Sequence, residues 1–400
     1  MPDAAATLPP GKAASLPSLA LFFLRLGFTA FGGPAAHIAM MEDELVRRRG
    51  WLTRDRFLDL LGAANLIPGP SSTELAIYIG YVQAGWLGLL LAGGCFVLPA
   101  AVMVGAIAWV YVHFGHLPQV TGLLYGVKPV IVAIIVQAIS RLVRTAIKTR
   151  LLGAVAAIAA AVAAAGIGPL YVLLGAGAAL GTLKWGQGER PRRVTPLLTM
   201  ASVAAVLIGV PLAIGLLAGV NGRFDLTRLF FVFLKLGSVV YGSGYVLLAF
   251  LRDELVVHRH WLLNAQILDA VAVGQVTPGP VFTTATFLGY LLGGFPGALI
   301  ATGAIFLPAF LLVFGSGRLI PRLRRSPVAA AFMDGINSAS VALMAVVTWQ
   351  LAVSAVVDPV TALLAATSAA VLLRYRVNSV WLILAGAIVG LLSSSGFRMW

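Results

Sequence analysis

Long apolar segments separated by short polar stretches run through most of this chain. A helix needs about 20 apolar residues to cross the hydrocarbon core of a bilayer, and several segments reach that length. We expect helices over residues 17–41, 57–82, 84–111, 117–140, 151–168, 169–184, 196–220, 229–251, 266–290, 292–316, 327–349, 358–373 and 378–396. Segments 151–168 and 169–184 meet at Gly166, Gly168 and Pro169, which predicts a tight helical hairpin. The pattern predicts an all-α polytopic membrane protein.

Four of the segments, 17–41, 57–82, 229–251 and 266–290, are interrupted by glycine and proline in the middle. Proline removes a backbone donor and glycine weakens a helix. Non-helical backbone at membrane depth is tolerated where it is buried in protein or lines a cavity. The four segments are therefore expected to be kinked spans or re-entrant hairpins. The interrupting residues are Gly32, Gly33, Pro34, Pro68, Gly69, Pro70, Gly242, Gly244, Pro278, Gly279 and Pro280.

The same sequence motif occurs twice, 210 residues apart. Leu26-Gly27, Asp43-Glu44-Leu45-Val46, Trp51-Leu52 and Pro68-Gly69-Pro70 recur as Leu236-Gly237, Asp253-Glu254-Leu255-Val256, Trp261-Leu262 and Pro278-Gly279-Pro280. This indicates gene duplication, and duplicated halves with broken helices are typical of transporters. We expect a polar tail at 1–16, homologous halves at 17–193 and 226–400, and a linking membrane segment at 194–225.

Loop charges predict that the two halves have opposite orientations. The loop at 141–150 has four basic residues and its repeat partner near 350–359 has none, whereas the loop at 318–325 has four and its partner near 109–116 has none. Lys and Arg accumulate in cytoplasmic loops, so the halves are expected to be inverted repeats. The arginine-rich loop at 41–56 is cytoplasmic by the same criterion. Counting crossings then makes 57–82 re-entrant from the cytoplasm and 266–290 re-entrant from outside.

Composition narrows the function classes. The 400 residues are 60% hydrophobic and 10% charged, with a formal net charge of +14. Cytoplasmic loop charge accounts for most of this excess, and an anionic cargo is a second contribution that composition does not separate from it. The charges lie in short loops rather than on one basic domain, which argues against nucleic-acid binding. The first 16 residues do not resemble a cleaved signal peptide. A single cysteine, Cys95, and five histidines without a zinc pattern predict no redox centre, metal or cofactor.

Each Pro-Gly-Pro motif is followed by small or hydroxyl residues that favour the first turn of a helix. A helix N-terminus presents free N–H groups and suits an anion. Two inverted copies would point two such termini at the membrane midplane. The alternative is a pair of kinks whose hydroxyl groups bond freed carbonyls. The candidate substrate-binding hydroxyls are Ser71, Ser72, Thr283 and Thr284.

Three cations lie within apolar sequence. Arg25 and Lys235 occupy equivalent positions of the repeat, and Lys128 follows Gly126-Val127. Ionisable residues inside a membrane are costly and mark transport pathways, so all three are candidate substrate ligands. The alternative for each of the three is snorkelling toward the interface.

Glu74 is the acid placed most clearly in an apolar stretch. Burial raises the pKa of a carboxyl group, so Glu74 is a candidate to carry a coupling proton, with a counter-ion to Arg25 or Lys128 as the alternative. Asp59 and its repeat partner Asp269 are expected to compensate helix N-termini. His37 is expected at the membrane interface rather than in a proton relay.

The sequence resembles the chromate ion transporter family in its two-domain form. Phe31 to Ile38, Trp51-Leu52 and Pro68 to Ser71 resemble its N-terminal domain, and Gly242 to Leu248 with Ala272 to Phe287 resemble its C-terminal domain. The resemblance covers nearly the whole chain from about residue 20. It implies a carrier in the bacterial inner membrane that exports chromate and confers chromate resistance, with sulfate as a structural analogue.

Other functions remain open at this point. Within transport, the alternative is sulfate uptake or general oxyanion exchange. A membrane-embedded enzyme is disfavoured because the sequence shows no nucleophile–base pair or metal set, so we expect a transporter rather than an enzyme. The expected partners are chromate, sulfate as its analogue and the lipid bilayer. A homodimer is left open.

Overall fold

The computed structural model describes residues 14–31, 33–115, 117–186, 224–241, 244–316, 326–375 and 377–396, and these ranges contain helices and no strand. The first half contains α1 (Leu16–Thr29), α2 (Pro34–Glu42), η1 (Asp43–Arg48), α3 (Arg54–Ala64), α4 (Ser71–Phe114), α5 (Pro118–Ala146), α6 (Arg150–Ala164) and α7 (Pro169–Gly186). The second contains α10 (Leu226–Val239), α11 (Leu247–Leu251), η3 (Arg252–His258), α12 (Asn264–Val276), η4 (Val281–Thr283), α13 (Thr284–Ser316), α15 (Pro327–Ala355), α16 (Pro359–Arg374) and α17 (Ser379–Gly396). The span expected at 196–220 lies outside the described residues.

The helices begin where local sequence favours a first turn. Proline stands in the first turn of α1, α2, α5, α15 and α16, where its missing N–H is not needed. The Thr149 hydroxyl accepts from the Leu152 N–H at the start of α6, and the Asp358 carboxylate accepts from the Thr361 N–H at the start of α16. This backbone hydrogen bond from Thr361 holds the pKa of Asp358 below its usual range.

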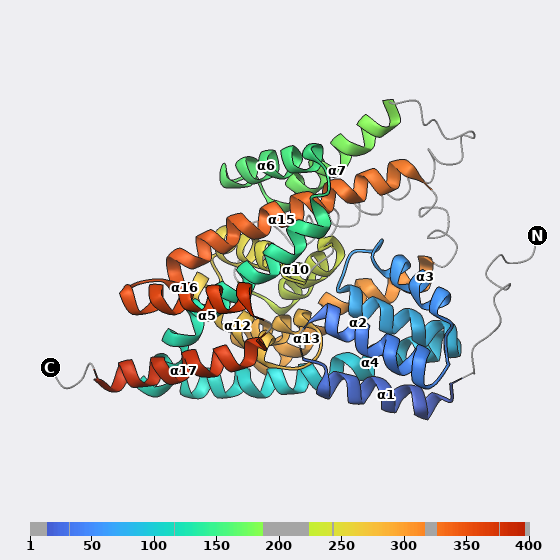
Figure 1. Ribbon diagram of the computed structural model, residues 1–400. Helices are drawn as coiled ribbons and strands as arrows, with labels where there is room; N and C mark the ends of the chain where they lie inside the picture. The colour runs from blue at the N-terminus through green and yellow to red at the C-terminus, as the bar shows by residue number, and fades with distance from the viewer. Residues whose placement is uncertain are drawn as a thin grey trace, which may run out of the picture.

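Among the described residues, four helices are long and apolar enough to cross a membrane: α4, α5, α15 and the stretch Val281–Gly315. Two of these, α4 and the stretch that contains α13, are folded back near their start. Residues Ala84 and Gly85 leave the helical conformation, and Gly293 and Gly294 do the same at the equivalent place. Figure 1 shows the long remainder of α4 running along one side of the molecule beside α1.

Close contacts across these bends show that the chain reverses direction. A Cβ atom on Gly80 would lie 2.1 Å from the Gly88 carbonyl oxygen, and one on Gly289 would lie 2.4 Å from that of Gly297. Only a folded-back chain brings these residues together. The chain therefore reverses between the segments expected at 57–82 and 84–111, and between those expected at 266–290 and 292–316. Helices α3 and α4, on either side of the first Pro-Gly-Pro motif, pack against each other, as do α12 and α13 on either side of the second. Entry and exit of 57–82 and 266–290 on one side of the membrane stay predictions.

The end of each half packs on the other half. Helices α6 and α7 pack against α15, and α16 and α17 pack against α5 (Figure 1). Glycine permits close approach at both contacts. A Cβ on Gly126 of α5 would lie 1.9 Å from the Gly386 carbonyl oxygen, and one on Gly335 of α15 would lie 2.4 Å from that of Ala176. The expected hairpin at 151–184 is confirmed, and its partner is a helix of the second half.

The two halves differ in how deeply their hairpins are buried. Helix α12 packs against α5, α15 and α17, whereas α3 packs mainly against α4. Leu58 of α3 is 46% exposed, and its repeat partner Leu268 is 0% exposed. Met40 of α2 is 38% exposed, and its partner Phe250 is 4% exposed. One face of α2 and α3 is thus open where the equivalent face of α11 and α12 is covered.

Candidate functional site

The broken segments of the two halves cross and bond to each other. The Gly69 N–H donates to the Val240 carbonyl over 2.7 Å, and the Gly279 N–H donates to the Ala30 carbonyl over 3.0 Å. Residues 69 and 279 are repeat partners, and so are 30 and 240. Each Pro-Gly-Pro tip therefore joins the helix break of the opposite half, and the four breaks meet in one region.

Glycine is required at both tips. Gly69 has φ 136° and Gly279 has φ 94°, in a region where an L side chain is strained. The prolines on either side fix the neighbouring backbone. Helix α4 starts directly after the first tip, and the 3-10 turn η4 leading into α13 starts directly after the second. The expected pair of helix starts at the Pro-Gly-Pro motifs is therefore present.

The hydroxyl residues at these starts are buried and bond within the protein. The Thr283 hydroxyl donates to the Pro280 carbonyl over 2.7 Å, and the Thr284 hydroxyl donates to the Val281 carbonyl over 2.6 Å. Ser72 Oγ lies 3.2 Å from His37 Nδ1, and Ser71 is buried beside it. In this conformation the hydroxyl groups of Thr283 and Thr284 stabilise the first turn, and a role in substrate binding stays a prediction.

The expectation that His37 lies at the interface is wrong. The residue is 0% exposed, and its Nε2 lies 3.0 Å from the Ala30 carbonyl oxygen. With Nε2 protonated, the ring donates to Ala30 and Nδ1 accepts from the Ser72 hydroxyl. His37 thus links the α1–α2 break to the start of α4. The sequence around His37 did not indicate this buried position.

The duplicated cations Arg25 and Lys235 have different surroundings. Lys235 Nζ donates to Glu254 Oε2 over 2.6 Å, and Arg259 Nε donates to the other oxygen of Glu254 over 3.0 Å. Arg25 lies on an exposed part of α1. The structure therefore gives Lys235 a structural partner at the α10–η3 hairpin, and binding of substrate by either cation stays a prediction.

Lys128 connects the two halves through an acid of the second half. Its Nζ lies 3.3 Å from Asp269 Oδ1, and the Tyr111 hydroxyl donates to Asp269 Oδ2 over 2.9 Å. Asp269 is 2% exposed and lies in the middle of α12, so the expected role in compensating a helix N-terminus is wrong for it. The network joins α12 to α4 and α5.

Glu74 has surroundings unlike those of the other acids. It is 0% exposed, and neither carboxyl oxygen has a hydrogen-bond partner. The expected alternative, a counter-ion to Lys128, is not found because Lys128 is paired with Asp269. Two further buried groups without a partner, Thr73 Oγ1 and the Tyr241 hydroxyl, were not identified from the sequence. The sequence did contain one signal for Tyr241: its repeat partner is Phe31, which lacks the hydroxyl group.

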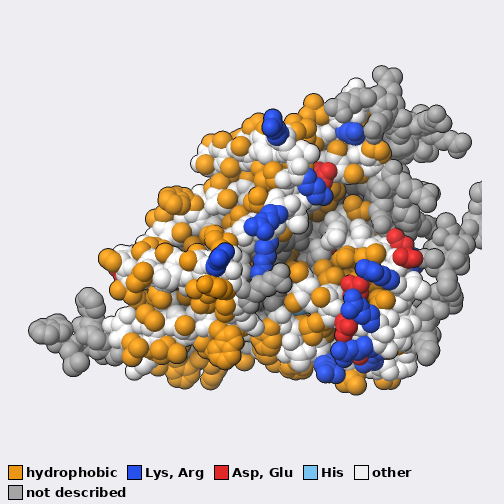
Figure 2. Space-filling model, in the orientation of Figure 1, with side chains coloured by type: hydrophobic (Ala, Val, Ile, Leu, Met, Phe, Trp, Pro, Cys, Tyr) orange, Lys and Arg blue, Asp and Glu red, His pale blue; other side chains and the backbone are white. Residues whose placement is uncertain are grey.

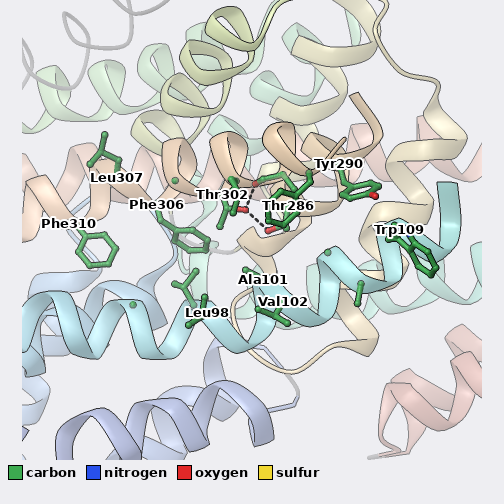
Figure 3. Close-up of a pocket in the computed structure, with 18 of the residues that line it drawn as sticks. Leu98, Ala101, Val102, Trp109, Thr286, Tyr290, Thr302, Phe306, Leu307 and Phe310 are labelled. Atoms are coloured by element: carbon green, nitrogen blue, oxygen red, sulfur yellow. Dashed lines mark hydrogen bonds between the residues drawn. The ribbon is translucent and has the colours of Figure 1, made fainter. Parts of the chain in front are cut away.

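A separate groove of about 840 Å³ lies between α4 and α13. Figure 3 shows Leu98, Val102 and Phe306 facing it, with a hydrogen bond of 2.7 Å between the Thr286 and Thr302 hydroxyls. Its lining contains no charged side chain, so it does not suit an oxyanion. Figure 2 shows a mainly hydrophobic surface over α16 and α17, with acidic and basic side chains together over the α2–α3 region.

Comparison with known proteins agrees with the duplicated architecture. The profile of the family described as "Chromate transporter" matches residues 17–182 and again residues 227–391. No solved structure matches the chain.

Three curated relatives match over most of their length. The "Chromate transport protein" of Cupriavidus metallidurans is 34% identical over 381 residues, which are 95% of this chain and 93% of that protein. The "Probable chromate transport protein" of Synechococcus elongatus is 32% identical, covering 86% of both chains. The "Chromate transport protein" of Pseudomonas aeruginosa is 32% identical, covering 84% of this chain and 81% of that protein. The duplicated, broken-helix chain is a multi-pass membrane protein that belongs to the chromate transporter family.

Proposed function

We propose that this protein is a secondary-active carrier that exports chromate from the cytoplasm across the bacterial inner membrane and so gives chromate resistance. The relatives named as chromate transport proteins support chromate as the substrate. Sulfate is the second candidate because it is also a tetrahedral dianion, and sulfate or general oxyanion exchange is the alternative function.

One observation carries the proposal, namely the reciprocal crossing of the four helix breaks. Gly69 bonds Val240 and Gly279 bonds Ala30, so the N-terminal turns of α4 and of η4–α13 start from the same region. A dianion leaving water needs several donors or cations to offset its desolvation. Helix N-termini supply such donors without a permanent counter-ion, which lets the anion leave again.

Export agrees with the electrical driving force. Moving one charge across the membrane potential changes the free energy by about 2.3 kcal/mol per 100 mV, and the inside of the cell is negative. A dianion is therefore driven outward without a further energy source. The substrate site would become accessible from one side of the membrane and then from the other. This would occur as the broken helices of one half move relative to those of the other half around the fixed crossing, as in other duplicated carriers.

Flux measurements test this function. Inverted membrane vesicles, whose cytoplasmic face is outward, receive radiolabelled chromate or sulfate in the external medium, and we expect the parent protein to accelerate chromate uptake more than sulfate uptake. Gly279→Ala should abolish most of the flux, because its Cβ would lie 2.6 Å from the Ala100 Cβ at a positive φ. Gly94→Ala is the matched control, since nothing lies within 4 Å of its Cβ position.

Two outcomes would contradict the proposal. A parent protein that moves neither anion is no carrier of this class, and one that moves sulfate alone is a sulfate carrier. The same assay decides the roles of Arg25 and Lys235. If Arg25→Ala and Lys235→Ala both keep parental flux, neither cation belongs to the substrate site. Arg374→Ala changes an exposed cation elsewhere and is the control that should keep parental flux.

A further inference from the structure

Three buried polar groups without partners belong to segments that form one of the two crossings. The Glu74 carboxyl lies against the Pro-Gly-Pro tip, since a Cβ on Gly69 would lie 2.4 Å from Glu74 Oε1. Thr73, the preceding residue of α4, is 0% exposed and its hydroxyl has no partner. Buried polar groups are almost always hydrogen-bonded in proteins, so three such groups at one place require an explanation.

The third group comes from the other half of the molecule. Tyr241 directly follows Val240, whose carbonyl accepts from the Gly69 N–H. Its side chain is 5% exposed, its hydroxyl has no hydrogen-bond partner, and it lies within electrostatic range of Glu74. The crossing itself therefore brings Tyr241 to the carboxyl group.

The equivalent crossing lacks this chemistry. Counted from the Pro-Gly-Pro motifs, before the one-residue shift that pairs Gly80 with Gly289, Glu74 corresponds to Thr284 and Thr73 to Thr283. Both of those hydroxyls bond carbonyls of their own turn. Tyr241 corresponds to Phe31, which has no polar atom in its side chain. The second crossing thus has no carboxyl group at this position, although Gln275 Nε2 before the second Pro-Gly-Pro motif is also buried without a partner.

The surroundings offer Glu74 no cation among the described residues. Lys128 is paired with Asp269 and Lys235 with Glu254. The helices packed here contribute apolar side chains to a common core, among them Phe23, Leu60 and Val313. The titratable groups nearby are Tyr241 and His37, which bonds Ser72 and the Ala30 carbonyl. An ionised carboxylate without partners is costly in such a place.

We propose that Glu74, Thr73 and Tyr241 form a proton-binding site whose occupancy is linked to that of the oxyanion at the neighbouring helix start. An aqueous proton forms an O–H bond with one oxygen of the Glu74 carboxylate, which removes its charge, and the same bond breaks when the proton leaves. The Tyr241 and Thr73 hydroxyls are the groups available to bond the carboxyl.

The linkage follows from charge and rests on the proposed oxyanion transport. An anion near the crossing repels an ionised Glu74 and is tolerated by a protonated one. Thermodynamic reciprocity then requires that each ligand increases the affinity for the other by the same factor. The proton and the oxyanion are therefore bound together and released together.

The test measures proton uptake during anion binding by the purified full-length protein. Chromate or sulfate is added in weakly buffered detergent solution with a pH indicator. At a pH high enough to ionise Glu74 in the anion-free protein, we expect the parent to take up close to one proton per bound anion, with an affinity that falls by up to about tenfold per pH unit as pH rises. Glu74→Gln, which mimics the protonated form, should bind the anion without proton uptake and with pH-independent affinity.

Further variants separate the site from general damage. Tyr241→Phe introduces the side chain of the first half and should keep proton uptake but move its pH range. Glu74→Thr introduces the side chain of the second half, and it replaces Glu74→Gln if that protein does not fold. Glu42→Gln removes an acid elsewhere in the same half and should behave as the parent.

Each remaining outcome contradicts the inference. Parental binding without proton uptake, or equal uptake by parent and Glu74→Gln, shows that Glu74 is not a linked proton site. Anion binding that depends on sodium and not on pH would show that the linked cation is sodium and not a proton. Parental binding or flux of neither anion instead defeats the proposed function, so the two failures are distinguishable.

Discussion

At the residue scale, one buried ion pair joins the two halves of the molecule. Lys128 of the first half pairs with Asp269 of the second over 3.3 Å, and Tyr111 supplies a third contact. Removing one member of a buried pair leaves an uncompensated charge, which costs more than the pair itself contributes.

Lys128→Ala should destabilise the protein by about 3 kcal/mol, near the lower end expected for breaking a buried pair because the lysine side chain is 20% exposed. The measurement is denaturant or thermal unfolding of the purified protein. Adding Asp269→Asn should restore most of the loss, since the remaining amide carries no charge and still accepts from Tyr111.

Lys235→Ala is the control for this prediction. Its partner Glu254 keeps a second cation, Arg259, at 3.0 Å, so the loss should be clearly smaller. An equal loss in both variants, or no recovery in the Lys128→Ala/Asp269→Asn protein, would contradict the assignment of Lys128 and Asp269 as a pair.

The sequence identified charged residues within apolar segments, but not their partners. Lys128, Lys235 and Glu74 all stand out because apolar residues surround them. Their partners depend on the crossing of the two halves, which periodicity does not contain. Asp269 was therefore misassigned, and Tyr241 was missed because it resembles an ordinary core aromatic residue.

At the element scale, glycine at the hairpin bends lets two helices touch through their backbones. Gly80 faces Gly88 in the first half, and Gly289 faces Gly297 in the second. Both reversals lie where the sequence predicted one apolar segment to end and the next to begin. The π-helical turns η1 and η3 were not predicted, although both contain the repeated sequence Asp-Glu-Leu-Val.

Gly80→Ala and Gly289→Ala should each destabilise the protein by about 3 kcal/mol, the upper part of the range for overpacking. The new methyl group would meet a backbone carbonyl at 2.1 Å or 2.4 Å, and a backbone group has no alternative rotamer. Unfolding measurements and the yield of monodisperse protein report the effect.

Gly94→Ala and Gly303→Ala are matched controls from the same two helices, because nothing lies within 4 Å of either Cβ position. Both should retain parental stability. If the Gly80 and Gly289 variants match these controls, the two parts of each hairpin are not in contact.

At the scale of the whole molecule, the halves share a backbone plan but not an environment. The described residues form two hydrophobic cores. One contains α1 to α3 with the first part of α4, and the other contains the second-half hairpins with α5 and α15. Leu58 is 46% exposed and Leu268 is 0% exposed although they are repeat partners. Residues at equivalent positions of the repeat are therefore exposed to different extents.

Cysteine labelling measures this inequality directly. In a Cys95→Ala background, Leu58→Cys should react with a membrane-impermeant maleimide from the cytoplasmic side, because the arginine-rich loop at 41–56 leads into α3. Leu268→Cys should react much more slowly from either side. Equal reactivity at the two positions would show that the halves are equally covered.

The orientation of the halves is tested at two other repeat partners. Thr145 and Ser354 lie near the ends of α5 and α15, the helices that precede the charge-rich and charge-free loops. In the same background, Thr145→Cys should label from the cytoplasmic side and Ser354→Cys from outside. Labelling of both from one side would refute the inversion.

The unequal burial of α3 and α12 makes the two halves inequivalent in the arrangement described. If the two halves exchange environments, α3 becomes covered and α12 becomes accessible from outside. Asp59 would then approach Asn337, the repeat partner of Lys128, and no salt bridge would form there. An arrangement with these environments exchanged would therefore lack the Lys128–Asp269 salt bridge and would differ in free energy from the one described.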